Sequence, residues 1–172
     1  MAGAEVTTAT FSRLKSPKRE AIEKALLKEF SSYPLQEATV ARIVEDAGIS
    51  RGAFYVYFTD LKDAYLYMCR EIIRRVHLSN PGGLESGDPE KYIEAVKTFV
   101  GSTEAKGYMK FFARAFVDNA KVTQEIWRQE AANPVAWAVS LLCHETIRSI
   151  YNGSDAQECI ERLRGVLSKL LA

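Results

Sequence analysis

The sequence predicts an all-α protein. Apolar residues recur at the three- and four-residue spacing of helices along the 172-residue chain, and no segment alternates apolar and polar residues as a half-buried strand does. Proline, glycine and asparagine separate these helical stretches. We expect a flexible N-terminal arm (residues 1–15), a three-helix domain containing a helix-turn-helix (residues 16–60), and a C-terminal helical domain (residues 61–172) joined to it by a fourth helix.

The first helix is expected to begin at Ser16-Pro17, because a capping residue followed by proline favours a helix start. Its apolar stripe predicts which face is buried. That stripe consists of Ile22, Ala25, Leu26, Leu27 and Phe30. The helix is expected to end over residues 31–34, where two serines and a proline interrupt the pattern.

Two short helices joined by a tight turn are predicted between Thr39 and Phe58. Thr39 is placed to cap the first of them, and Gly48 falls at its end, where a left-handed backbone is cheap only for glycine. Ser50 is placed to cap the second helix, which buries Phe54 and Phe58 on successive turns. This order of caps, turn and buried residues is that of a helix-turn-helix.

The outer face of the second short helix has residue types that suit the major groove of DNA. Arg51 offers a bidentate donor for guanine or phosphate, and the methyl group of Ala53 fits thymine. The hydroxyl of a tyrosine such as Tyr55 bonds phosphate oxygens. Two short helices with a glycine corner also occur in many other helical proteins, so an ordinary helical core stays open as an alternative.

A fourth helix is expected from Asp60, its cap, to about His77. Its buried side would be formed by Tyr65, Met68, Ile72, Ile73 and Val76. Residues 79–89, rich in glycine, proline and serine, are the clear linker of the chain. After this linker we expect helices over residues 89–103, 104–117, 121–131, 134–151 and 155–171.

The distribution of charge points to the N-terminal third as the part that meets an acidic partner. From Arg13 to Arg75, 12 basic and 9 acidic residues give a net charge of +3, whereas the remainder from Val76 to Ala172 carries −1. No apolar run approaches the roughly 18 residues that span a bilayer. The N-terminus lacks the basic and apolar segments of a signal peptide. We therefore expect a cytoplasmic protein without a membrane partner.

The sequence lacks the motifs of catalytic or metal sites. The odd number of cysteines, scattered through helical stretches, predicts free thiols in a reducing compartment; they are Cys69, Cys143 and Cys159. The two histidines, His77 and His144, are far apart in the sequence. Neither a zinc spacing nor a phosphate-binding glycine loop nor a nucleophile motif is present. We expect neither an enzyme nor a bound cofactor.

Residues 19–65 resemble the N-terminal domain of TetR-family regulators. In that family a first helix running from isoleucine to phenylalanine is followed by a threonine-capped second helix and an Ala-Gly-Ile/Val-Ser turn. The recognition helix then ends in the pattern aromatic-Tyr-x-Tyr-Phe. The matching residues fall here in the same order and at the same spacing: Ile22 and Phe30, Thr39, Ile43, Ala47 to Ser50, Gly52, and Phe54 to Phe58.

This resemblance implies a set of DNA-contacting residues. Tyr55 and Tyr57 would chiefly hold phosphates, with Arg51 and Ala53 nearest the bases. The implied set is Thr39, Ser50, Arg51, Gly52, Ala53, Tyr55 and Tyr57.

Two departures from the family pattern affect this carry-over. Pro34 stands where the family usually has glycine, so the first turn must be built differently. Leu61 stands where the family usually has lysine and Lys62 follows it, so Lys62 is expected to supply the phosphate contact at the start of the fourth helix. Outside the resemblance, the outward position of Arg42 makes it a candidate for groove or backbone contact. The basic residues before or at the start of the first helix are further candidates for phosphate contacts: Arg13, Lys15, Lys18 and Arg19.

The last two helices carry apolar stripes that would leave apolar surface exposed in a monomer. Pairing them with a second copy gives a four-helix interface with two-fold symmetry, which the resemblance also implies. The alternative is that the stripes face the core of their own chain. The expected interface residues are Val135, Val139, Leu142, Ile160, Leu163, Leu167 and Leu170.

The middle helices are rich in aromatic residues. The resemblance implies a small-molecule pocket in this region, and aromatic walls would favour a flat or apolar ligand. A packed aromatic core without a ligand is the alternative. The expected lining is Tyr92, Phe99, Tyr108, Phe112, Phe116 and Trp127.

Taken with the resemblance, the sequence predicts a DNA-binding transcriptional regulator. We expect a homodimeric repressor that leaves a palindromic operator in double-stranded DNA when a small apolar or aromatic effector binds. A TetR-like adaptor whose C-terminal domain binds a protein partner is the alternative. A helical enzyme or carrier that uses the aromatic interior is a third hypothesis, and it predicts no binding to a specific duplex.

Overall fold

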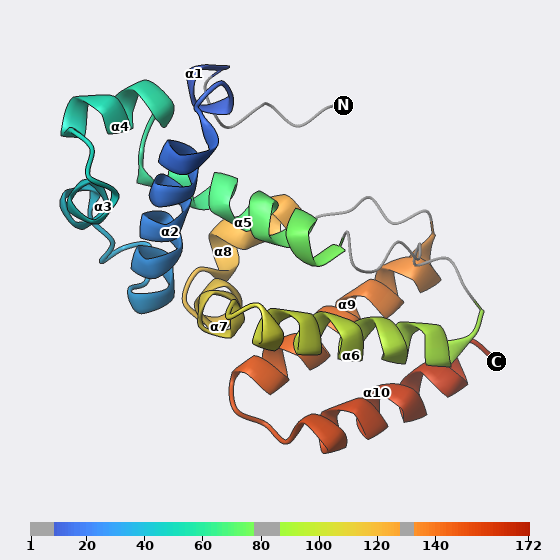
Figure 1. The fold of residues 1–172 in the computed structure, drawn as a ribbon. Coiled ribbons are helices and arrows are strands. Elements are labelled where there is room, and N and C mark those ends of the chain that lie inside the picture. The colour runs from blue at the N-terminus through green and yellow to red at the C-terminus, as the bar shows by residue number, and fades with distance from the viewer. Residues whose placement is uncertain (1–8, 78–86, 128–132) are drawn as a thin grey trace.

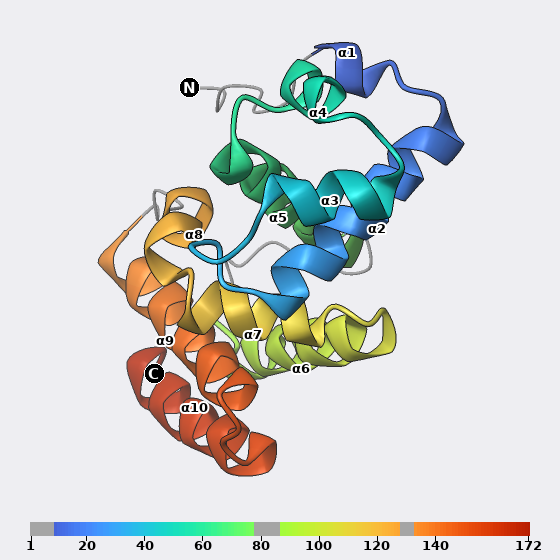
Figure 2. The ribbon, with the colours of Figure 1, turned by 90° about the vertical axis from the view of Figure 1, so that its left-hand side faces the viewer.

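The computed structural model describes residues 9–77, 87–127 and 133–172, and these residues form helices and connecting turns without a strand. The helices are α1 (Ala9–Ser12), α2 (Ser16–Ser32), α3 (Val40–Ala47), α4 (Arg51–Tyr57), α5 (Leu61–His77), α6 (Pro89–Ala105), α7 (Met109–Val117), α8 (Ala120–Trp127), α9 (Pro134–Tyr151) and α10 (Ala156–Leu170). Helices α1 to α4 gather at one end of the molecule, and α9 and α10 lie at the other (Figures 1 and 2). The all-α prediction is confirmed.

The N-terminal unit is held together by the first apolar stripe. Ile22, Leu26 and Phe30 of α2 are fully buried and face α3 and α5. The Phe30 ring meets the Tyr65 ring of α5 edge to face, with centroids 5.1 Å apart. Helix α2 packs against α3 and α5, and α4 packs against α3 (Figure 1). Helix α2 therefore holds the two short helices in place.

The caps that the sequence predicts for the two short helices are present. The Thr39 hydroxyl accepts a hydrogen bond from the Arg42 amide, and the Ser50 hydroxyl accepts one from the Ala53 amide at 3.1 Å. Gly48 ends α3 with φ at +63°, a left-handed conformation that would strain any side chain. The turn between α3 and α4 is therefore set by local sequence.

The start of the chain differs from the prediction in two ways. The residue that precedes α2 as its N-cap is Lys15, and Ser16 lies inside the helix, where its hydroxyl donates to Glu20 Oε1 at 2.8 Å. Residues 9–15, expected to belong to a flexible arm, include the short helix α1. Its Phe11 side chain is 1% exposed, so α1 is part of the core of the N-terminal unit.

Helix α5 begins as the sequence predicts and joins the two units. The Asp60 carboxylate accepts a hydrogen bond from the Asp63 amide at 2.7 Å, and Asp63 in turn accepts from the Thr59 amide at 2.8 Å. The amides of Thr59 and Asp63, just before and within the first turn of α5, thus both have a carboxylate acceptor. The first residues of α5 are thereby fixed directly behind the end of α4.

Helices α6, α7, α9 and α10 form the C-terminal unit, in which α6 lies alongside α9 and α10 (Figure 1). Helix α7 begins at Met109, later than predicted, because the Tyr108 amide donates to the Thr103 carbonyl at 2.7 Å and closes the end of α6. Within the described residues, no helix has the length and apolar character needed to cross a membrane. Cys69, Cys143 and Cys159 are buried free thiols.

Two hydrogen bonds tie the C-terminal unit to the turn that follows α2. The Leu35 amide donates to Asn119 Oδ1 at 3.0 Å, and Arg114 Nη2 donates to the Ser32 carbonyl at 3.4 Å. Asn119 is 4% exposed. The turn in which Pro34 replaces the family's usual glycine is therefore supported by a side chain from the other unit.

Most of the expected dimer residues pack within their own chain. Val139, Ile160, Leu163 and Leu167 are at most 4% exposed, and Leu142 is partly buried against the same core. Of the seven expected residues, Val135 and Leu170 remain exposed. The regular stripes of α9 and α10 therefore hold the two helices to the C-terminal core, and apolar residues on other faces of these helices are left at the surface.

Candidate nucleic-acid interface

Helix α4 presents one strip of side chains to solvent. Phe54 and Phe58 are fully buried, whereas Tyr55 and Val56 are 48% and 51% exposed. Arg51 and Gly52 are also exposed and lie one turn before Tyr55 and Val56. The strip formed by Arg51, Gly52, Tyr55 and Val56 is the candidate DNA-binding surface, which we call the recognition strip.

Gly52 is the most informative member of the recognition strip. A Cβ built on this residue would meet only the Ser50 hydroxyl, at 3.9 Å, so no neighbour in the described part of the chain requires glycine there. Glycine inside a helix costs about 0.5–1 kcal/mol relative to alanine. A residue that weakens its own helix without an internal reason fits a surface against which another molecule packs closely.

The edge of α4 that carries Arg51 and Tyr55 borders an open groove of about 640 Å³. The rest of its lining comes from the start of α3 and the start of α5; the lining is Ala38, Thr39, Val40, Ala41, Arg51, Tyr55, Asp60, Leu61 and Lys62. The structure thus brings Thr39, Arg51, Tyr55 and Lys62, predicted separately from the sequence, to one surface. Arg51 Nη2 donates to the Tyr55 hydroxyl at 3.5 Å, so these two side chains already lie together.

Ser50, Ala53 and Tyr57 have other positions. Ser50 is exposed and uses its hydroxyl as the α4 cap, while Ala53 is half-buried at the border of the strip. Tyr57 is 6% exposed, and its ring packs edge to face against Phe11 with centroids 5.6 Å apart. The structure does not support the DNA contact expected of Tyr57, because its ring fills the core of the N-terminal unit.

Arg42 is also turned away from the role expected of it. Its Nη2 donates to Glu29 Oε1 at 2.6 Å and to the Glu37 carbonyl at 2.7 Å. Its guanidinium carbon lies 4.0 Å from the centre of the Tyr33 ring. The hydrogen bond to Glu29 raises the pKa of Arg42. Arg42 therefore serves the turn between α2 and α3, where its Nε and Nη2 groups donate to the chain itself.

The comparisons with known proteins bear on this same region. Residues 22–63 match the model of the family described as bacterial regulatory proteins, tetR family. Residues 22–63 are therefore similar to the N-terminal domain of TetR-family regulators. The matched residues run from α2 to Asp63 in the first turn of α5, so the family's N-terminal domain, that of DNA-binding regulators, coincides with the unit that carries the recognition strip.

The whole fold is similar to that of a solved structure. A TetR family transcriptional regulator from Chloroflexus aurantiacus J-10-fl superposes with a TM-score of 0.59 and 20% sequence identity. The match covers 96% of this chain and 94% of the other chain. At that identity the likeness concerns the fold alone. A comparison with curated protein sequences gives no match.

Three of the aromatic residues expected to line a pocket, Phe99, Phe112 and Phe116, form a packed cluster with Tyr151. Phe112 lies between Phe99 and Tyr151, with ring centroids 5.0 Å and 6.1 Å away, and Phe116 stacks on Tyr151 at 5.7 Å. The other described members of the expected set are buried too: Tyr92 is 4% and Tyr108 9% exposed. The side chain of Trp127 lies outside the part that the structure describes.

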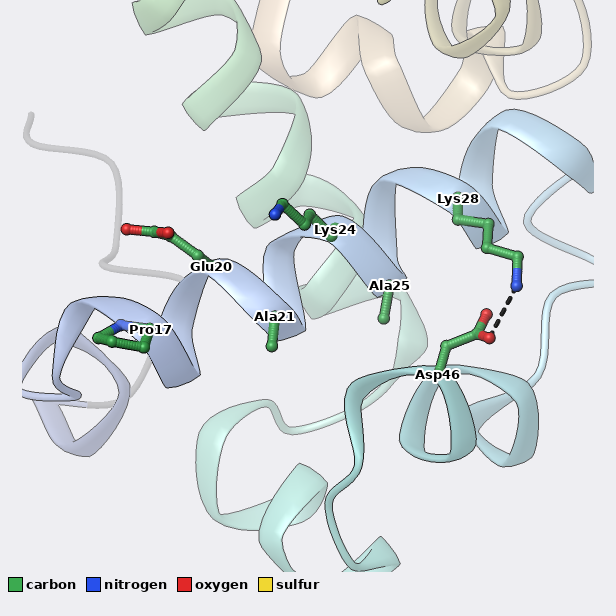
Figure 3. A pocket seen from close by; sticks show the side chains of 7 residues that line it. All are labelled: Pro17, Glu20, Ala21, Lys24, Ala25, Lys28 and Asp46. Carbon is green, nitrogen blue, oxygen red and sulfur yellow. Dashed lines mark hydrogen bonds and ion pairs between the residues drawn. The ribbon is translucent and has the colours of Figure 1, made fainter.

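A second open groove, of about 390 Å³, runs along the outer face of α2 (Figure 3). It is lined by Pro17, Glu20, Ala21, Lys24, Ala25, Lys28 and Asp46. At one end Lys28 donates to Asp46 Oδ1 at 2.7 Å, which pins α2 to the end of α3. None of the predicted DNA-contacting residues lines this groove, whereas four of them line the groove beside α4.

Proposed function

We propose that the chain is a transcriptional regulator that binds operator DNA through the recognition strip of α4. The observation that carries this proposal is the exposed Gly52 in the middle of that strip, where an added Cβ would meet only the Ser50 hydroxyl. With Gly52 bare, the helix backbone can approach the base edges, and Arg51 and Val56 would lie on either side of it. Arginine bonds guanine, and an apolar side chain contacts a thymine methyl group.

The groove beside α4 supports phosphate contacts on one side of the DNA site. Lys62 supplies positive charge and Thr39 and Tyr55 supply hydroxyl groups within it. The Asp60 carboxylate lies in the same groove, and it is engaged in capping α5 through the Asp63 amide. In this proposal, Lys62 and Arg51 outweigh that single negative charge.

We propose a homodimer, because a palindromic operator needs two recognition helices about 34 Å apart. Helix α9 exposes Trp137 and Leu141, 60% and 53% accessible and one turn apart. Helix α10, which packs against α9, exposes Val166 and Leu170. Paired with their two-fold copies, these side chains would be removed from water, which favours association. We therefore propose that these exposed residues form the dimer interface, in place of the buried stripe predicted from the sequence.

A ligand-released repressor is the regulatory mode that we propose. The hydrogen bond from the Leu35 amide to Asn119 connects the N-terminal unit to the C-terminal unit, which contains the aromatic cluster. This connection supports coupling between the two units. An effector would have to open the Phe112, Phe116 and Tyr151 cluster. The tight packing of that cluster favours, as a second candidate, an adaptor whose C-terminal unit binds a protein partner through the exposed face of α9.

Selection of bound sequences from random DNA duplexes tests the DNA-binding proposal. The full chain should enrich a palindrome whose half-sites are about one helical turn, or a multiple of it, apart. The mass of the complex should correspond to two chains, or a multiple of two, per duplex. Binding to the selected duplex should weaken steeply as salt rises, because phosphate contacts release counterions.

The possible results separate the hypotheses. An enriched palindrome that a lysate-derived aromatic metabolite fraction releases supports the repressor, and one that only a protein fraction releases supports the adaptor. Absence of any enriched duplex would reject both and leave the helical enzyme or carrier. An enriched site without symmetry would reject the dimer alone.

A further inference from the structure

The segment before α2 is attached to the recognition helix by one aromatic side chain. Phe11 of α1 inserts its ring among those of Tyr57, Phe58 and Tyr67, with centroids 5.6, 4.9 and 5.1 Å away. Leu14 packs against the same core, and its amide donates to the Phe11 carbonyl at 3.0 Å. A buried phenylalanine of this kind contributes several kcal/mol, so α1 is held firmly at the end of α4.

The same segment is basic on its outer side. Arg13, Lys15 and Lys18 are all exposed, and no acidic residue occurs between Ala9 and Arg19. Among the described residues, no carboxylate pairs with Arg13 or Lys15. Lys18 lies over the Tyr57 ring, 5.8 Å from its centre. The charge is therefore concentrated beside the recognition helix, and we call these three residues and their anchor Phe11 the basic arm.

The basic arm and the groove lie on opposite edges of α4. At 100° per residue, positions 51 and 55 share one edge, 52 and 56 the centre of the exposed side, and 53 and 57 the other edge. Arg51 and Tyr55 border the groove with Lys62. Tyr57 borders α1, which runs beside α4 in both views (Figures 1 and 2).

A helix in the major groove has a phosphate backbone on each side, because the groove is about 12 Å wide and an α-helix fills it. The groove beside Arg51 and Tyr55 accounts for only one of these backbones. The basic arm stands where the other would pass, and its charge has the complementary sign.

We propose that the basic arm is a second DNA-binding element, which holds the phosphates on the edge of the major groove away from Lys62. This inference rests on the proposed function of α4 and goes beyond it by assigning the opposite strand's contacts to residues before the helix-turn-helix. Phe11 is a positioning residue, and Arg13 and Lys15 make the contacts. Because phosphates are bound irrespective of base, the arm adds affinity to the operator and to its flank.

The test compares two double variants of the full chain on the duplex selected by the unaltered protein. Arg13→Ala/Lys15→Ala removes two exposed charges of the arm, and Lys91→Ala/Lys97→Ala removes two exposed charges of α6 in the other unit. The arm variant should bind about tenfold more weakly or worse. Its plot of log affinity against log salt should flatten by about 1.8 for each bound chain, at about 0.9 per lost phosphate contact. The α6 variant should match the unaltered protein.

Hydroxyl-radical footprints give the second readout. The arm variant should lose protection of the backbone on one side of each half-site and keep it on the other. If its salt slope and footprint equal those of the α6 variant, the arm does not contact DNA, although α4 does. If the unaltered chain selects no duplex, the proposed function itself fails and this inference falls with it. Equal stability of both variants in urea confirms that the charges, and not the fold, were changed.

Discussion

The buried carboxylate of Glu29 and the guanidinium of Arg42 hold the turn between α2 and α3. Glu29 Oε1 accepts from Arg42 Nη2 at 2.6 Å and from the Thr39 amide at 2.7 Å. The Glu29 side chain is 2% exposed and that of Arg42 is 38% exposed. One carboxylate thus positions both the Thr39 cap of α3 and the segment that leads to it. A buried charge of this kind is tolerated because it has a cation and hydrogen-bond donors beside it.

Arg42→Met should therefore destabilise the protein without removing a DNA contact. The change leaves the Glu29 carboxylate buried without its cation, so the free energy of unfolding in urea should fall. Arg148→Met is the matched control, because Arg148 pairs with Glu145 where both side chains are 53% exposed. Its unfolding midpoint should hardly move. If Arg42→Met keeps its stability and its salt slope on operator DNA falls by about 0.9 for each bound chain, Arg42 contacts phosphate after all.

Gly52→Ala separates stability from DNA binding. Because the new methyl group meets only the Ser50 hydroxyl at 3.9 Å, the helix should gain about 0.5–1 kcal/mol of unfolding free energy. Affinity for the selected duplex should nevertheless drop, since the methyl group stands between α4 and the base edges. Urea titration and fluorescence anisotropy measure the two effects. A variant that is more stable and binds equally well would remove Gly52 from the interface.

Trp137→Glu should dissociate the proposed dimer. A charge on the 60%-exposed side chain of α9 would be buried unpaired in the interface but would remain in water in the monomer. Light scattering should report half the mass of the unaltered protein, with unchanged helix content. Val117→Glu on α7 is the control, because Val117 is likewise exposed, at 47%, on a helix outside the proposed interface. Two proteins of equal mass would reject the interface on α9.

The thiols should resist modification while the chain is folded. Burial raises the pKa of Cys143 to about 11 and that of Cys69 to about 12, so at pH 8 both stay protonated and shielded. A thiol reagent at pH 8 should label them slowly in buffer and completely within minutes in urea. Rapid labelling of three thiols without denaturant would contradict the packing of α5 and α9.

The helix-turn-helix was predictable because its determinants are local. Thr39, Gly48 and Ser50 act on residues within four positions, so spacing alone located the caps and the turn. The start of α5 was predictable for the same reason, because its cap Asp60 accepts from the amide of Asp63, three positions later. The inward position of Tyr57 also had a local signal: it lies three residues after Phe54, on the buried side of the helix. The resemblance nevertheless placed Tyr57 among the DNA-contacting residues, because the family pattern has a tyrosine at this position.

Other features depend on partners distant in the sequence. Glu29 reaches Arg42 across a turn, and Asn119 reaches Leu35 over 84 positions, so neither bond follows from periodicity. Periodicity found the stripe of Ile160, Leu163 and Leu167 but not which surface covers it. Only the packing of α6 and α9 on α10 shows that the stripe belongs to the core and that Val166 and Leu170 remain outside.

The base preference of Arg51→Ala tests the DNA-binding account most directly. Arg51 is exposed and caps nothing, so its removal should leave the unfolding transition unchanged. When random duplexes are selected in parallel, the unaltered chain should enrich a palindrome, and the variant should enrich the same palindrome with the preference lost at one position of each half-site. The loss of one bidentate contact in each half-site should weaken binding by about 1–3 kcal/mol for each bound chain. An identical motif bound with identical affinity by both proteins would contradict the assignment of α4 as the recognition helix.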